Sequence, residues 1–475
     1  MSNWVEEVAA PAAIRPEPAG KPGRLSRSAV GWALHQGGRD PQVILMTIYI
    51  WAPYFATVVA PTPVEGQALL ALNSTISGWI VALTAPFLGV VVDRLGPRKP
   101  GLAVTTLLMV PLIAALWWAT PGGMPVGVIV GILALTGVLF AYSEIHHNAM
   151  LPLAAPGHEA SGASGLALAA GNGVSVLVLL FALWAFALPG QVDWEFVPRE
   201  PLFGLSRDAH EPDRVVAFIA AGLMVLSLVP VLLFAKDAPP SGLSIGGALK
   251  ESVIQFRGLL GLLRAHRDAT VFLLSRMLYA DGKLSVLIFG GVFAAGVMGW
   301  QTLELLAYGV LLSIFAVIGG LSSAGLDRRL GPKRAVQIEI LGTLTPIVGI
   351  LGMAPDRILY IPHDPAAYAP VWDGPLFRTW PEVVYLLCGF CLAVFISAAY
   401  ASSRTLLTRL APADKIGGFF GLYALSGAAT AWLGPMLVSI FTTAFASQRA
   451  GFVPIAGLLL AGLVGLFFVK GGGRD

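Results

Sequence analysis

Charged and aromatic side chains gather inside an otherwise apolar stretch in the second half of the chain, at Arg276, Tyr279, Asp281 and Lys283. An ionised side chain inside a membrane costs at least a few kcal/mol, so such groups usually face a cavity and mark a transport pathway. Asp281 could accept a proton or bind a substrate ammonium, while Lys283 or Arg276 could bind a carboxylate. The structural alternative is that Asp281 neutralises a neighbouring cation and holds the helices together.

A second polar group lies at the start of the first apolar stretch, where His35, Arg39 and Asp40 precede Pro41. The residue before a proline is biased away from helix, which favours a break here. If the helix begins near Ser28, Arg39 and Asp40 lie well inside the membrane. If Pro41 begins it, both charges lie among the lipid headgroups.

Two tight basic loops with a shared pattern, residues 89–99 and 326–334, each join a pair of long apolar stretches. A loop that recurs between hydrophobic spans indicates two related halves, because duplication copies the helix-loop-helix unit with its turn glycine and charges. The order of leucine, ring, glycine and cation in residues 34–39 also recurs in residues 278–283. This second repeat favours placing Arg39 inside the first span and predicts a break or a close helix approach at both sites.

The elements that position these residues are expected to be transmembrane helices. The chain is 56% hydrophobic and 12% charged, with a mean hydropathy of +0.76, which is too apolar for a soluble domain of 475 residues. A bilayer-crossing helix needs about 20 mostly apolar residues, and on that scale the chain offers about twelve spans, one of them centred near Ala428. We therefore predict an all-α membrane protein with about twelve transmembrane helices in two pseudo-symmetric six-helix bundles.

Lysine and arginine residues outside the spans gather mostly on one side, so the positive-inside rule places that side and both termini in the cytoplasm. Residues 1–27 lack an apolar core followed by a cleavage site, so they are not expected to be a signal peptide. On the outer side, residues 191–214 and 354–380 are long enough to form lids, but we favour plain connectors. The expected domains are a disordered cytoplasmic tail (1–27), an N-terminal six-helix bundle (28–235), a cytoplasmic linker with an amphipathic helix (236–268) and a C-terminal six-helix bundle (269–475).

Several classes of function are disfavoured by the composition. The net charge is +3 and the basic residues form short clusters between spans, so nucleic acid is not an expected partner. No phosphate-binding loop, metal-ligand spacing or nucleophile motif is evident, so we expect neither an enzyme nor an ATP-driven pump, and no cofactor or metal. Cys388 and Cys391 lie in one apolar run and are interpreted as packing residues.

The first basic loop resembles the major facilitator superfamily signature Gly-x-x-x-Asp-Arg-x-Gly, at residues 89–96. Within that superfamily the chain is most similar to the vacuole-effluxer branch, the autophagy-related amino-acid permeases and their bacterial relatives. Relatives usually carry Tyr-Asp and then Asn-Ser in the first helix, where this chain has His35-Gln36 and Arg39-Asp40. The matching segments are residues 32–34, 52–55, 148–152, 161–165, 279–282 and 419–427.

The resemblance implies the major facilitator fold and secondary active transport of a small polar or zwitterionic metabolite, such as an amino acid or small peptide-like molecule. Alternating access with protons as the coupling ion is expected, in a monomer of a bacterial inner membrane. It also places Asn172, Tyr400 and Tyr423 on cavity-lining helices, although helix packing explains Asn172 equally well. The expected substrate- or proton-binding residues are His35, Arg39, Asp40, Asn172, Arg276, Tyr279, Asp281, Lys283, Tyr400 and Tyr423.

Gating roles follow from the same resemblance. Glu144 and His147 end the fourth span and could pass a proton, but an acid here commonly pairs with an arginine of the basic loop in the superfamily. We therefore favour a latch between Glu144 and Arg94 or Arg98, with Asp93 facing the amino end of the eleventh helix near residues 417–418. The residues expected to act in gating are Asp93, Arg94, Arg98, Glu144, His147, Asp327 and Arg328.

Two other functions stay open at this point. A transporter of an amphipathic lipid or drug would have a wide apolar cavity that opens laterally. A non-transporting sensor or assembly factor would bind a ligand or partner without flux. Its effect would be lost when the outer segments or the linker are removed, rather than when Asp281 is neutralised.

Overall fold

The computed structural model describes residues 25–156, 159–240, 246–247, 261, 263–412, 419, 422–423, 425–427 and 429–471. Eleven helices of this described part are long and apolar enough to cross a membrane. The predicted all-α membrane fold is confirmed, and the chain is an integral membrane protein. Residues 1–24 of the predicted tail and most of the predicted linker lie outside the described residues, so those domain boundaries stay predictions.

The first half supplies six spans, and the first of these is irregular. It changes from α-helix to π-helix and back, whereas the other five are mainly single long helices. The elements of the first span are α2 (Arg27–Leu34), α3 (Gln36–Val43), η1 (Ile44–Tyr49), α4 (Trp51–Tyr54) and η2 (Phe55–Val59). The remaining elements are α5 (Pro63–Leu95), α6 (Lys99–Ala115), η3 (Leu116–Trp118), α7 (Val126–Ala154), α8 (Glu159–Ala182), η4 (Leu183–Ala187), η5 (Leu202–Gly204), α9 (Glu211–Arg214) and α10 (Val216–Phe234).

The second half also begins with a long span, but here that span is one uninterrupted helix, α12. The span expected near Ala428 is represented by the short apolar helix α17, and Ala428 itself lies outside the described residues. A short antiparallel hairpin, β1 (Arg357–Ile358) and β2 (Ile361–Pro362), lies in a connector. The other elements are α12 (Arg267–Met298), α13 (Thr302–Leu330), α14 (Pro332–Leu351), η6 (Pro365–Ala367), α15 (Trp380–Leu410), α17 (Leu433–Ala444) and α18 (Gln448–Phe467).

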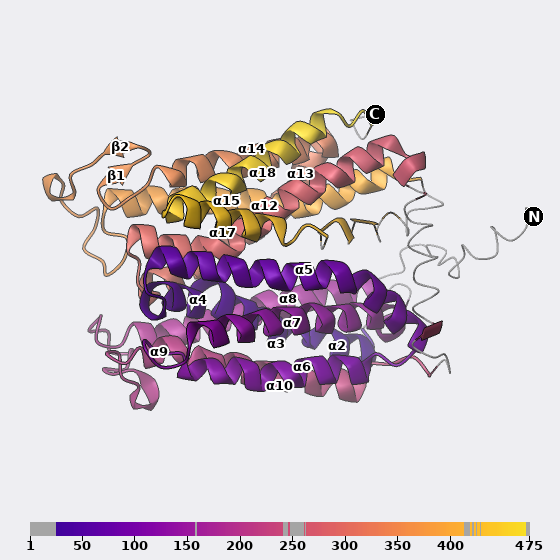
Figure 1. The fold of residues 1–475 in the computed structure, drawn as a ribbon, viewed down its shortest axis with the longest axis horizontal. Coiled ribbons are helices and arrows are strands. Elements are labelled where there is room, and N and C mark those ends of the chain that lie inside the picture. Colours follow the sequence, from indigo (N-terminus) through magenta and orange to yellow (C-terminus); the bar gives the residue numbers. More distant parts are fainter. Residues whose placement is uncertain are drawn as a thin grey trace, which may run out of the picture.

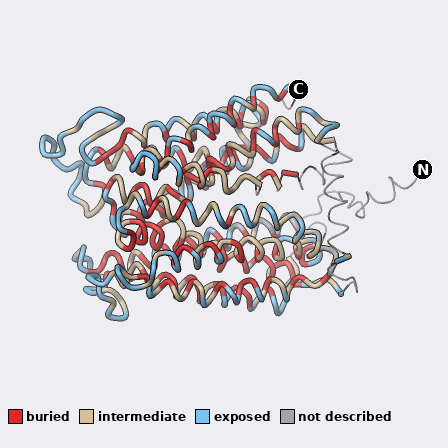
Figure 2. The backbone as a smooth tube through the Cα atoms, in the orientation of Figure 1, coloured by how far each residue is buried: buried red, intermediate tan, exposed pale blue. Residues whose placement is uncertain are grey.

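The two halves form two bundles that lie side by side, the first half below and the second above in Figure 1, with α5 packed along α17. We call the end that carries Leu25, Gly96, Gly331 and Gly471 the terminal end, and the end that carries α9 and the β1–β2 hairpin the hairpin end. Buried residues line the inner faces, whereas many apolar side chains on the outer faces are exposed (Figure 2). That pattern is typical of helices whose solvent is lipid.

The sequence predicts a break or a close approach where glycines adjoin charges, and the structure shows close approach. Helix α12 runs without interruption past Asp281, so no break occurs there. In the first span the α-helix continues through Asp40 and Pro41 to Val43, a π-helix follows, and the backbone leaves helical angles only at Ile50 (φ −121°, ψ −70°). A side chain at Gly38 would collide with Ser227 and the backbone of α10, which explains the glycine. Pro41 removes only one backbone hydrogen bond of the helix, and the π-helix that follows continues the hydrogen bonding of the backbone. The first span therefore stays helical past the proline.

Candidate functional site

Helix α12 carries the charged cluster of the second bundle. Arg276, Tyr279 and Lys283 lie at positions i, i+3 and i+7, so they share one face of the helix. Asp281 lies on a different face. All four side chains are buried, and Asp281 and Lys283 are each only 1% exposed. The structure therefore brings together the four residues that the sequence placed in this cluster, but it divides them between two faces.

Arg276 is engaged by the segment that precedes α17. Its Nη1 donates to the backbone carbonyl of Tyr423 at 2.7 Å and to the hydroxyl of Ser426 at 2.6 Å. The guanidinium also lies over the Tyr423 ring, 3.4 Å from the ring centroid. Arg276 thus holds α12 against this segment. Arg276 and Tyr423, two of the residues expected in the site, are in direct contact.

Asp281 caps the start of α17. Its Oδ2 accepts a hydrogen bond from the backbone N–H of Gly434 at 2.7 Å. A carboxylate at a helix N-terminus is stabilised by the unpaired N–H groups and the helix dipole. Gly434 permits this approach, because a side chain there would collide with Ser285 and contact Asp281. The contact joins two helices, as the structural alternative expects, but the partner is a backbone N–H and not a cation, and Oδ1 is buried without a hydrogen-bond partner among the described residues.

Lys283 lies in an aromatic setting. Its Nζ is 3.8 Å from the ring centroid of Tyr400 and 5.4 Å from that of Tyr279. Tyr279 is itself fixed, since its hydroxyl is 2.9 Å from Ser403 Oγ. Cation–π contacts are worth about 2 kcal/mol when desolvated, whereas burying an ammonium costs several kcal/mol. The aromatic rings therefore compensate only part of the cost of burying Lys283.

A buried acid that the sequence analysis assigned to no site completes this region. Glu339 on α14 is 0% exposed. Its Oε1 accepts a hydrogen bond from Ser402 Oγ at 2.8 Å, and its Oε2 is buried without a partner among the described residues. The carboxylate interacts electrostatically with Lys283, at a separation beyond that of a direct ion pair. The signal for it was an isolated acid inside the ninth apolar stretch.

The first bundle has a corresponding cation, Arg39, which is 8% exposed. Arg39 lies 3.5 Å from Asp40 (Nε to Oδ1) and 3.5 Å from Glu144 on α7 (Nη1 to Oε1). Asp40 also accepts hydrogen bonds from Gln36 Nε2 at 2.8 Å on both oxygens. The structure thus places the acid expected in the latch beside Arg39.

The latch between Glu144 and the first basic loop stays a prediction. The side chains of Asp93 and Arg94 and residues 417–418 lie outside the described residues. The observed partner of Glu144 is Arg39 within its own bundle. In the second basic loop Asp327 is partly buried and Arg328 is exposed.

The basic loop of the first half is held by Asp237, which the sequence analysis missed. Its carboxylate accepts hydrogen bonds from the backbone N–H of Arg98 at 2.9 and 3.0 Å and from that of Lys99 at 2.9 Å. Asp237 therefore caps α6 from the segment that follows α10, and it ties the start of the linker to the loop.

The buried histidines join helices of the first bundle. His147 Nε2 lies 2.9 Å from the carbonyl of Trp32, and Trp32 Nε1 donates to the carbonyl of His147 at 2.7 Å. The two rings stack with centroids 4.5 Å apart. His35 Nδ1 lies 3.1 Å from Ser227 Oγ on α10. These reciprocal contacts describe packing of α2 against α7 and α10.

Asn172 does not join either cluster. It is exposed on α8 and forms no hydrogen bond with another described residue. Its neighbour Gly171 packs closely against the carboxylate of Asp40. The close helix approach expected for this glycine pair is therefore present at Gly171.

Side-chain hydrogen bonds join the two bundles in their hairpin-end halves. Gln67 Nε2 on α5 donates to Thr442 Oγ1 at 2.8 Å and to the carbonyl of Gln448 at 3.1 Å. Gln448 Nε2 returns a hydrogen bond to the carbonyl of Pro63 at 3.0 Å, and Ser439 Oγ donates to the carbonyl of Ala68 at 3.1 Å. Between described residues, these bonds and one from Thr302 are the side-chain hydrogen bonds that cross the interface.

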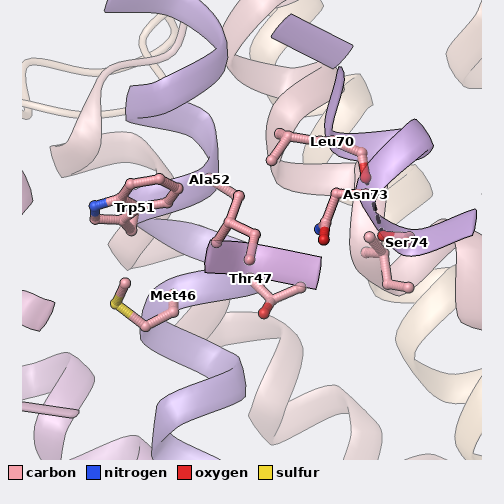
Figure 3. A pocket seen from close by; sticks show the side chains of 9 residues that line it. Met46, Thr47, Trp51, Ala52, Leu70, Asn73 and Ser74 are labelled. Carbon is pink, nitrogen blue, oxygen red and sulfur yellow. Dashed lines mark hydrogen bonds between the residues drawn. The ribbon is translucent and has the colours of Figure 1, made fainter. Parts of the chain in front are cut away.

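A small cavity lies just inside this junction. It has a volume of about 30 Å³, room for one water molecule, and is lined by the first span, α5, α7 and α12. Figure 3 shows Trp51 and Met46 of the first span on one side of the space and Leu70, Asn73 and Ser74 of α5 on the other. Asn73 Oδ1 is buried without a partner among the described residues. The hairpin-end half of the interface is therefore almost closed at this point.

A larger cavity of about 310 Å³ lies at the hairpin end between the bundles. Asp213 connects them there, because it accepts a hydrogen bond from the hydroxyl of Thr302 and lies 3.2 Å from His210 (Nδ1 to Oδ2). The hydrogen bond to Asp213 raises the pKa of His210 above its usual value. Arg207 lines the same cavity and donates to the carbonyls of Phe186 and Ala187 at 3.1 and 2.7 Å.

Residues 56–472 match the protein family described as "Vacuole effluxer Atg22 like". Autophagy-related protein 22-1 of Aspergillus niger is 28% identical over 214 residues, which cover 44% of this chain and 33% of that protein. Autophagy-related protein 22 of Yarrowia lipolytica is 26% identical over 212 residues, covering 43% and 32%. The matched part thus spans about a third of the length of these fungal relatives.

Solved structures share the fold at low identity. The nucleoside transporter NupG aligns with a TM-score of 0.57 and 13% identity, covering 93% of this chain and 98% of that one. A bacterial homologue of the human lysosomal transporter Spinster, inward-facing and occupied, aligns with a TM-score of 0.60 and 13% identity, covering 94% and 95%. These neighbours establish the major facilitator architecture for this chain.

Proposed function

Because this chain belongs to the Atg22-like vacuole effluxer family, and is therefore a transporter rather than an enzyme, we propose that it moves a small polar or zwitterionic metabolite by alternating access. An amino acid or small peptide-like molecule is the proposed substrate, and protons are the proposed coupling ion. The observation that carries the proposal is a pair of buried cations, Arg39 and Lys283, each on the first span of its bundle and each accompanied by a carboxylate.

A cation on the first span of each bundle, with acids nearby, suits a zwitterion. Arg39 has Asp40 and Glu144 beside it, and Lys283 has Glu339 in its vicinity. A substrate carboxylate can be bound by either cation, and an ammonium by the acids of the first bundle. The bundles are joined at the hairpin end, which is the arrangement that alternating access requires in one of its end states.

The wider setting is also proposed. We place the protein as a monomer in a bacterial inner membrane. Both termini are placed in the cytoplasm, because basic residues gather at the terminal end. The curated relatives reported above are fungal, and they support membership of the family rather than a bacterial origin. In the proposed orientation, the hairpin end faces away from the cytoplasm.

The test is uptake into proteoliposomes. Purified protein is reconstituted and offered a labelled panel of amino acids, dipeptides and small metabolites, with and without an inward proton gradient. We expect saturable flux of at least one zwitterion that the gradient stimulates. Lys283→Met and Arg39→Gln should each strongly reduce that flux, because each removes one of the two cations available to the substrate carboxylate, whereas Arg357→Gln in the hairpin should leave the flux unchanged.

Two outcomes would contradict the proposal. Flux of amphipathic compounds alone would indicate a lipid or drug transporter. Saturable binding without flux of any compound would indicate a sensing or assembly role.

A further inference from the structure

We propose that Glu339 is the residue that binds the coupled proton and that Lys283 is the cation it neutralises. Protonation of Glu339 would leave the charge of Lys283 available to a substrate carboxylate. This inference rests on the proposed function of proton-coupled transport, and it adds a residue that neither the sequence motifs nor the family match identified.

Burial and incomplete hydrogen bonding make Glu339 a candidate proton site, a property that it shares with Asp281. It is completely buried, and only one of its two carboxylate oxygens has a donor, the hydroxyl of Ser402. An ionised carboxylate has about four acceptor sites, so a buried one with a single donor is under-satisfied. A proton on Oε2 removes this deficit without any movement of the helices.

The charges that face Glu339 come from three helices. Lys283 and Tyr279 lie on α12, and Asp327 lies on α13. On α15, Arg404 acts on Lys283, and Ser402 supplies the hydrogen bond. Helix α18 also packs on α14, and its one titratable residue, Arg449, binds the carbonyl of Met353 at 2.9 Å. Lys283 is therefore the buried cation that interacts with Glu339. Asp327 is a nearby acid, and its negative charge repels that of Glu339.

The other acid of α12 is less suited to this role. Asp281 accepts a hydrogen bond from the backbone N–H of Gly434 at the N-terminus of α17, so its carboxylate is already engaged in holding that helix end. Arg276 is likewise held by Tyr423 and Ser426. Lys283 has the aromatic faces around it and the cations Arg276 and Arg404 in its vicinity, and Glu339 is the acid that acts on it.

The coupling follows from charge balance. When Glu339 is ionised, its charge offsets that of Lys283 and weakens the attraction of Lys283 for an incoming carboxylate. When Oε2 takes up a proton, the substrate carboxylate replaces the lost anion as the countercharge of Lys283. Binding of proton and substrate must then favour each other reciprocally, so substrate binding should draw a proton from solution.

The experiment compares wild type with Glu339→Gln in proteoliposomes, using the substrate found in the uptake panel. The glutamine mimics the protonated acid, so we expect gradient-driven uptake to fall by about tenfold or more while exchange of labelled for unlabelled substrate without a gradient persists. Glu382→Gln is the matched control: it lies on α15 and its carboxylate caps that helix, a role that glutamine also fills.

A second measurement needs no transport. Substrate added to weakly buffered protein in detergent should take up protons in wild type, and infrared difference spectra between acid and neutral pH should contain a protonated-carboxyl component from Glu339. The proton uptake and this component should be missing in Glu339→Gln and remain in Glu382→Gln. If Glu339→Gln does not fold, Ser402→Ala replaces it, and driven uptake should then extend to higher pH because the carboxylate loses its donor.

The outcomes separate the two proposals. No flux in wild type would overturn the proposed function and this inference together. Gradient-driven flux in wild type that persists in Glu339→Gln, or a difference spectrum that the substitution leaves unchanged, would overturn the assignment of Glu339 and leave the transport proposal intact.

Discussion

The backbone N–H of Gly434 donates to the carboxylate of Asp281 across 2.7 Å, so a charge from the middle of α12 fixes the first turn of α17. Helix α17 is short, and its partner α5 belongs to the other bundle. The contact therefore couples the charged cluster of the second bundle to the interface between bundles.

Removing this cap should destabilise the protein. We expect Asp281→Ala to lose about 1.5–3 kcal/mol, because a hydrogen bond to a charged group disappears and the N–H of Gly434 stays buried. Asp281→Asn, which keeps an acceptor, should lose less. Thermal unfolding in detergent measures both, and equal stability of Asp281→Ala and wild type would show that the contact contributes nothing.

Gln67 should control opening at the hairpin end. Gln67→Leu removes two hydrogen bonds to the second bundle, each worth about 0.5–1.5 kcal/mol. The small cavity inside the junction should then be reached more often. In a background with Cys388 and Cys391 replaced by alanine, a cysteine at Asn73 should react faster with a polar thiol reagent. Gln337→Leu on α14 is the control, and unchanged rates would contradict a gating role for Gln67.

The contact between His210 and Asp213 should make the hairpin end sensitive to pH. The folded protein raises the pKa of His210 above its usual value of 6.5, so the contact stabilises the fold below that pH and is lost as pH rises through the raised pKa. We expect wild type to exceed His210→Gln in apparent Tm at about pH 5.5 and to match it at about pH 9. A constant difference across this range would exclude the protonated histidine as the cause.

Asp237 should stabilise the basic loop of the first half. Asp237→Ala leaves the N–H groups of Arg98 and Lys99 without their acceptor, which costs about 0.5–2 kcal/mol at a helix N-terminus. Amide exchange over the first turn of α6 should become faster in this variant and stay near the wild-type rate in Asp237→Asn. Uniformly faster exchange over the whole chain would instead indicate global destabilisation.

The sequence determined the membrane character, the two-bundle plan and the family, because hydropathy, span length and the repeated basic loop are local patterns that duplication preserves. It also located Arg39, Asp281 and Lys283 as charges inside spans, since a charge in an apolar stretch is visible without any neighbour.

Only the tertiary structure decided which groups these charges meet. Asp281 finds the N–H of Gly434, Arg39 finds Glu144, and Lys283 finds the distant Glu339, each on a helix far away in sequence. Asp237 carried no motif, so nothing local distinguished it from an ordinary acid, and Glu339 was visible as an isolated acid in an apolar stretch but without any sign of its partners. The physical reason is that the cost of a buried charge is set by the donors and countercharges around it, and those are brought together only when the helices pack.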